Sequence, residues 1–130
     1  MSNFGVVVVA GTYPSARATD PVVRWADQVP ATSIGAWIAD TANLYGPHAR
    51  NQVVTLATLD HGAATPIATC TAWKQAIVAG QYPYIATIAG TPWTRWLKAD
   101  PAFRIVAHDQ GATVFELVGT PDVNCDQSYP

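Results

Sequence analysis

The sequence predicts an α/β fold of Rossmann-like type: three layers, with a mainly parallel sheet, flanking helices and a C-terminal antiparallel hairpin. Three times a capping residue directly precedes a proline, at Asp20-Pro21, Thr65-Pro66 and Thr91-Pro92, and this pairing marks a helix start. Apolar runs rich in β-branched residues alternate with these starts, as in a parallel sheet with helices on its faces. Asp109-Gln110-Gly111 then separates two further apolar runs, which indicates a hairpin.

The first elements are a strand and a helix. Four consecutive valines followed by Ala10, over residues 6–10, favour a buried extended strand. A helix is expected to begin at Pro21 and end at Pro30, because apolar residues recur there at helical spacing. These residues are Val22, Trp25, Ala26 and Val29.

The middle of the chain is expected to alternate in the same way. Strands are predicted over residues 33–39, 52–59 and 82–89, because these runs are continuously apolar, as in strands covered on both faces. A short helix or turn over residues 41–45 ends at Gly46-Pro47. A second helix is expected from Pro66 to Gly80. Its apolar positions are Ile67, Cys70, Trp73 and Ile77.

The last third of the chain predicts a helix and a hairpin. Trp93, Trp96 and Leu97 recur at helical spacing after Pro92, and Asp100-Pro101 ends the helix. Strands over residues 103–106 and 114–117 are expected to pair antiparallel, with the terminal strand at an edge of the sheet. Residues 1–119 then form a single α/β domain, and residues 120–130 form a polar C-terminal tail.

Composition limits the classes of function. A chain of 130 residues that is 49% hydrophobic can fill the core of one domain. The net charge of −2 and the scattered basic residues exclude a nucleic-acid partner. No apolar run approaches the roughly 20 residues of a membrane-spanning helix. Neither a nucleotide-binding glycine motif nor a nucleophile elbow is present, so no cofactor is expected.

The candidate ligand-binding residues follow strands. In parallel sheets, ligands bind beyond the carboxyl ends of the strands, and exposed helix N–H groups there can receive an anion. The carboxylate of Asp60 could orient the imidazole of the adjacent His61. The alternative interpretation is that these residues cap their own helices or cover the end of the sheet. The candidates are Thr12, Tyr13, Asp40, Tyr45, Asp60 and His61.

Two cysteines permit one pairing within the chain. A Cys70–Cys125 disulfide would tie the polar tail to the body and suit an oxidising compartment. The alternative is a buried inert Cys70 and a free thiol in the tail. Two isolated cysteines lack the spacing of a zinc site, and no metal site is predicted.

Several segments carry a resemblance to a known family. They are Tyr13-Pro14-Ser15-Ala16-Arg17, the helix Asp20-Pro21 to Trp25, Leu44-Tyr45-Gly46, Asp60-His61-Gly62, and the final Trp93 to Pro101 segment. Together they resemble the soluble extracytoplasmic C-terminal domain of bacterial, actinobacterial-type polytopic membrane glycosyltransferases. That class uses lipid-phosphate sugars and is similar to the protein O-mannosyltransferases.

The resemblance implies an accessory role and supports the disulfide. The catalytic carboxylate of that family lies in a loop between early membrane helices, and no part of this sequence matches it. The chain is therefore expected to be non-catalytic by itself, within a parent glycosyltransferase. Its expected partners are the membrane domain of the same parent chain and a sugar or polyprenyl-phosphate headgroup, at the extracytoplasmic face of the cell membrane. The alternatives are a free-standing small-ligand-binding α/β module and a structural or interaction domain.

Overall fold

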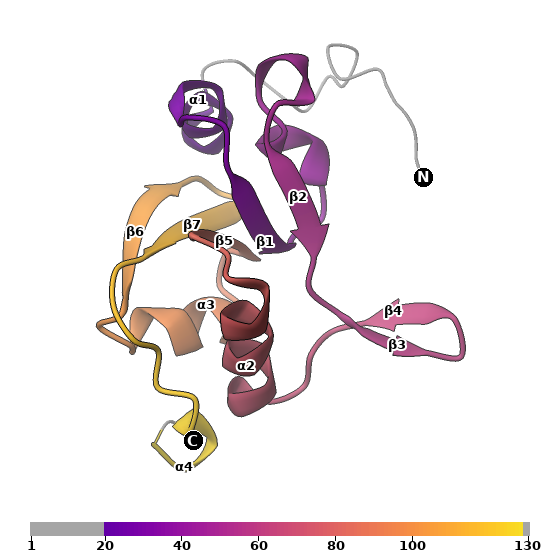
Figure 1. Ribbon diagram of the computed structural model, residues 1–130, viewed down its shortest axis with the longest axis vertical. Coiled ribbons are helices and arrows are strands. Elements are labelled where there is room, and N and C mark those ends of the chain that lie inside the picture. Colours follow the sequence, from indigo (N-terminus) through magenta and orange to yellow (C-terminus); the bar gives the residue numbers. More distant parts are fainter. Residues whose placement is uncertain (1–19, 129–130) are drawn as a thin grey trace.

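The protein has a mixed α/β fold. The computed structural model describes residues 20–128, so the expected strand over residues 6–10 and the candidates Thr12 and Tyr13 lie outside the described residues. Within this range a five-stranded sheet forms the centre and a separate two-stranded hairpin projects from it (Figure 1).

The elements follow one another as an alternation of strands with α-helices and short 3-10 helices, labelled η. In chain order they are α1 (Pro21–Gln28), β1 (Ser33–Trp37), η3 (Thr41–Leu44), η4 (Pro47–Ala49), β2 (Gln52–Thr55), β3 (Thr58–Asp60), β4 (Ala63–Thr65), α2 (Cys70–Gly80), β5 (Tyr84–Ile88), α3 (Pro92–Lys98), β6 (Phe103–His108), β7 (Ala112–Leu117) and α4 (Cys125–Ser128).

The five-stranded sheet has the order β2-β1-β5-β7-β6. β1 pairs in parallel with both β2 and β5, whereas β7 pairs antiparallel with both β5 and β6. The predicted antiparallel hairpin is therefore confirmed. The predicted edge position of its terminal strand is wrong, because β7 lies between β5 and β6 and β6 forms the edge.

Burial explains this order. Val114 and Phe115 of β7 are both fully buried, in different apolar clusters, so β7 needs cover on both faces. On β6, Arg104 is exposed and Ile105 is 40% exposed, which an edge strand tolerates.

The two apolar clusters lie on opposite faces of the sheet, since neighbouring residues along a strand alternate between them. Ile85 belongs to the first cluster and Ala86 to the second. The first is built with Trp73 and Ile77 of α2 and Leu97 of α3. The second is built with residues of α1 and η3, including Val22 and Leu44.

The middle of the chain departs from the prediction in two places. The predicted strand over residues 52–59 divides into β2 and β3, and the second helix begins at Cys70 instead of Pro66. The actual cap is Thr69, whose hydroxyl accepts a hydrogen bond from the Ala72 amide at 3.2 Å. β3 and β4 pair antiparallel across a two-residue turn in which His61 and Gly62 have φ angles of 51° and 81°. Positive φ at both central positions defines the type I′ turn that matches the twist of a hairpin.

The segment after Gly119 lies against the body of the domain. The predicted disulfide between Cys70 and Cys125 is confirmed, and it joins α4 to the first residue of α2. Beside it, the Asp126 carboxylate accepts a hydrogen bond from the Thr71 amide at 3.0 Å. The Asp122 amide donates to the Asp100 carboxylate at 2.9 Å.

Candidate functional site

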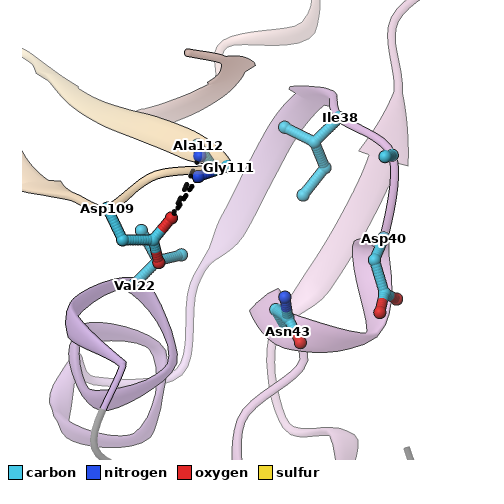
Figure 2. Close-up of a pocket in the computed structure, with 8 residues that line it drawn as sticks. Val22, Ile38, Asp40, Asn43, Asp109, Gly111 and Ala112 are labelled. Atoms are coloured by element: carbon cyan, nitrogen blue, oxygen red, sulfur yellow. Dashed lines mark hydrogen bonds between the residues drawn. The ribbon is translucent and has the colours of Figure 1, made fainter. Parts of the chain in front are cut away.

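A small pocket of about 100 Å³ lies beyond the carboxyl end of β1. The residues that line it come from the start of α1, the segment after β1, η3 and the turn between β6 and β7 (Figure 2). They are Val22, Ile38, Ala39, Asp40, Asn43, Asp109, Gly111 and Ala112. The position agrees with the rule that ligands bind at the carboxyl ends of parallel strands.

Asp40 and Asn43 form the side of the pocket that η3 provides. Asp40 is the N-cap of η3, and its Oδ1 accepts a hydrogen bond from the Ala42 amide at 3.0 Å. The Asn43 Oδ1 is buried and has no hydrogen-bond partner among the described residues. A buried amide oxygen without a partner loses its hydration at a cost of about 1–3 kcal/mol, so a donor that reached it would be bound favourably.

Asp109 forms the opposite side of the pocket (Figure 2). Its Oδ1 accepts hydrogen bonds from the Gly111 amide at 2.9 Å and the Ala112 amide at 3.1 Å, which fixes the β6–β7 turn. The Gly111 carbonyl in turn accepts a hydrogen bond from the Ala89 amide, just after β5. The turn is thereby held beside the carboxyl end of β5.

The pocket is lined by both polar and apolar side chains. The residues that line it include two carboxylic acids and an amide, Asp40, Asp109 and Asn43, together with the apolar Val22 and Ile38, a combination that suits the hydroxyl groups and C–H faces of a small polyol. Two side-chain ion pairs, Lys74–Asp100 and Arg104–Glu116, occur within residues 20–128, and none of their members lines the pocket. The close contact between Asp60 and His61 also lies outside it.

The other sequence-predicted candidates lie elsewhere. Tyr45 is half-buried just after η3 and is not a lining residue of the pocket. Asp60 and His61 lie in the β3–β4 hairpin, which projects from the body (Figure 1). Their side chains are 66% and 96% exposed, with 3.4 Å between the carboxylate and the imidazole.

The expectation that Asp60 and His61 directly follow a parallel strand is wrong. The parallel strand β2 ends at Thr55, and both residues belong to the antiparallel β3–β4 hairpin that comes after it. Among the described candidates, the structure places Asp40 alone at the pocket. Sequence reasoning missed Asn43 and Asp109 as site residues. Asp109 was recognised as a turn residue, and the position of that turn in the fold is what places it at the pocket.

A buried ion pair lies away from the pocket. Lys74 Nζ is 2.7 Å from Asp100 Oδ2, and both side chains are buried. Burial acts to raise the pKa of Asp100, but hydrogen bonds from Lys74 and from the Ala102 and Asp122 amides together hold this pKa below its usual value. These contacts join α2, the end of α3 and the C-terminal segment, so the pair has a structural role.

One group of potential metal ligands occurs in the part of the chain that the structure describes, formed by Cys70, Cys125 and Asp126. Because both sulfur atoms belong to the disulfide, they cannot act as thiolate ligands. The group therefore offers a metal ion one exposed carboxylate.

Comparison with known proteins adds no relative: no family model, curated protein or solved structure matches this chain. Among residues 20–128, no helix has the length and apolar character needed to cross a bilayer.

Proposed function

We propose that this chain is an accessory domain of a polytopic membrane glycosyltransferase that uses lipid-phosphate sugars. In this proposal the domain catalyses nothing by itself and contacts the sugar or polyprenyl-phosphate headgroup of the donor, or the acceptor. It works at the extracytoplasmic face of the membrane, against the membrane domain of its own parent chain. Its three layers are Rossmann-like, an inference supported by the two apolar clusters on opposite faces of the sheet.

The pocket between Asp40, Asn43 and Asp109 is the observation that carries this proposal. Its acceptor oxygens and its apolar side chains match a hydroxyl-rich ring, and the ion pairs of the described residues lie outside it. The disulfide supports the compartment, because such bonds persist in oxidising, extracytoplasmic surroundings.

The proposed ligand-contacting set keeps the sequence candidates and gives them different places. Asp40 acts in the pocket, joined by Asn43 and Asp109, and Tyr45 acts from the end of η3. Asp60 and His61 contact the ligand or acceptor from the tip of the hairpin. Thr12 and Tyr13 complete the proposed set from outside the described residues.

Titration of the isotope-labelled full chain with mannose 1-phosphate, followed by NMR, tests the proposal. We expect amide shifts at residues 40–43 and 109–112, with a Kd no tighter than about 1 mM, since few charges are arranged to bind the ligand. Asn43→Ala should weaken these shifts, whereas Glu116→Gln, remote from the pocket lining, should leave them unchanged.

Two results would contradict the proposal. Shifts confined to β6 or α4 would place binding elsewhere. Sugar transfer from a lipid-phosphate donor by the isolated chain would show that the domain is itself catalytic.

A further inference from the structure

We propose that the outward side of α3 contacts the surface of an anionic lipid bilayer through tryptophan rings and two basic side chains. The contact residues are Trp93, Arg95, Trp96 and Lys98 of α3, together with Trp37 at the end of β1. These five residues are called the indole–cation surface below. The contact deepens the proposed function, on which the identity of the membrane rests.

Helical spacing determines which residues of α3 point outward. Thr94 and Leu97 are the buried residues of this helix, and they mark its inner side. At 3.6 residues per turn, Arg95 and Trp96 lie on the opposite side, and the second indole and the second cation of the helix flank them. Arg95 and Lys98 are exposed, and both indoles are half-buried. The helix therefore presents indoles and positive charges side by side to its surroundings.

Three of the five tryptophans of the sequence gather at this surface. The ring centroids of Trp37 and Trp93 are 6.3 Å apart, and those of Trp93 and Trp96 are 6.2 Å apart with an interplanar angle of 78°. The Trp93 indole N–H donates a hydrogen bond to the Ile67 carbonyl at 2.8 Å, which fixes the central ring. All three rings pack on the border of the first apolar cluster and stay half-buried. Tryptophan is enriched at membrane interfaces, where an apolar ring body and a polar N–H are both accommodated.

The two cations indicate the kind of bilayer. Arg95 and Lys98 join no side-chain ion pair within residues 20–128. The acid nearest to them along the chain is Asp100, which is buried and bound to Lys74. Basic side chains in the last turn of a helix also favour its C-terminal dipole, so the charges alone define no site. Together with three indoles, they complement the negative surface of an anionic bilayer.

The indole–cation surface and the pocket meet at the carboxyl end of β1. Trp37 is the last residue of this strand, and the next residue, Ile38, lines the pocket. Trp37 packs against the first apolar cluster and Ile38 against the second, so their side chains lie on opposite faces of the sheet. A bilayer against α3 therefore brings the end of β1 to the lipid headgroups, where a lipid-phosphate sugar presents its polar part.

Sedimentation of the full chain with large unilamellar vesicles tests the proposal. We expect binding to vesicles made of equal parts phosphatidylcholine and phosphatidylglycerol, and at least about tenfold weaker binding to phosphatidylcholine alone. The double variant Arg95→Gln/Lys98→Gln should bind the anionic vesicles about 25-fold more weakly, since each basic residue near such a surface contributes about a factor of five. Equal binding by the parent chain and this variant would overturn the proposal.

Arg24→Gln/Arg104→Gln is the matched control, because it changes the net charge equally on the other face of the sheet. Arg24 lies on α1, which packs on the face opposite α3 (Figure 1). Arg104 follows Phe103, a residue of the first cluster, so the alternation along β6 directs it to the face of α1. The control should weaken vesicle binding less than about threefold. Equal losses in the two double variants would show that net charge alone drives binding and would refute the surface.

Quenching of tryptophan fluorescence by brominated lipid in the anionic vesicles tests the indoles. Trp96→Phe should lower the quenched share of the emission, whereas Trp25→Phe, on α1, should not lower it. A loss of quenching with Trp25→Phe alone would place the contact on the opposite face. No vesicle binding by the parent chain would favour a protein partner, and either result overturns the proposal. If vesicles bind while mannose 1-phosphate fails to shift the pocket, the indole–cation surface stands and the proposed function fails.

Discussion

Removal of the disulfide should be the most costly single covalent change to this fold. Cys70 and Cys125 are separated by 55 residues, and the loop that they close contains α2, β5, α3, β6 and β7. On the chain-entropy model, closing a loop of this length restricts the unfolded chain and stabilises the folded state by about 4 kcal/mol. The double variant Cys70→Ala/Cys125→Ala should lose about this free energy of unfolding.

Equilibrium urea unfolding, followed by tryptophan fluorescence, measures the loss. The dependence of unfolding free energy on urea should also rise slightly, because an uncrosslinked unfolded chain exposes more surface. Asp126→Ala is the control: it removes one hydrogen bond between α4 and α2 and should cost below about 1 kcal/mol. A loss below about 1 kcal/mol in the double cysteine variant would refute the reasoning, since α4 and Asp122 would then hold the segment without the covalent bond.

Three further predictions follow from single side chains. Asp100→Asn should cost about 3–5 kcal/mol at pH 7, because the buried Lys74 loses its carboxylate partner. The pKa of Asp100 is lower in the folded state than in the unfolded state, so the ionised carboxylate stabilises the fold fully at pH values above the unfolded-state pKa. This stabilisation is lost as the pH falls through the folded-state pKa. The difference in unfolding free energy between variant and parent should therefore shrink in urea titrations at pH 2. His61→Asn should slow amide exchange in the β3–β4 hairpin several-fold, because asparagine tolerates the positive φ of this turn. His61→Ala should speed the exchange, because alanine does not tolerate it. Equal exchange rates in the two variants would contradict this reasoning. Asn51→Ala should cost about 3 kcal/mol in thermal or urea unfolding, because a buried amide that joins α1, η3 and the start of β1 is lost, whereas the exposed Gln52→Ala should be nearly neutral.

Elements whose signals are local could be predicted from the sequence. α1 and α3 begin at Pro21 and Pro92, as expected, because proline fits the first turn of a helix; the N-cap residues Asp20 and Thr91 make no side-chain capping hydrogen bond. β1 and β5 fall within the predicted apolar runs. Both strands have three consecutive buried residues, which is the pattern expected of strands covered on both faces.

The failure at Thr65-Pro66 has a physical cause. Proline also fits an extended backbone, and it disfavours helical geometry in the residue before it, so the pair marks an extended segment as well as a helix start. The real start at Cys70 depends on the Thr69 hydroxyl, which lacks a proline beside it. The hairpin before it turns on His61-Gly62, where the common Asn-Gly or Asp-Gly signal is missing.

The pocket could not be predicted because it is assembled by distant segments. Asp109 reaches it because β7 inserts between β5 and β6, and this order depends on which strand needs cover on both faces. Asn43 reaches it because η3 packs on the same face as α1. Local patterns identify a turn and a short helix, whereas their meeting at one edge depends on tertiary packing.

The β3–β4 hairpin gives this domain a position where length can change freely. Every residue from Thr58 to Ala64 is exposed, and neither apolar cluster includes any of them. Residues inserted between His61 and Gly62 would extend the hairpin into solvent, and the entropy of closing a longer loop grows only slowly with its length. A peptide tag or a reporter domain placed there should leave the sheet and the disulfide intact while it disrupts the proposed contacts of Asp60 and His61, so an insertion separates the role of the hairpin tip from the stability of the fold.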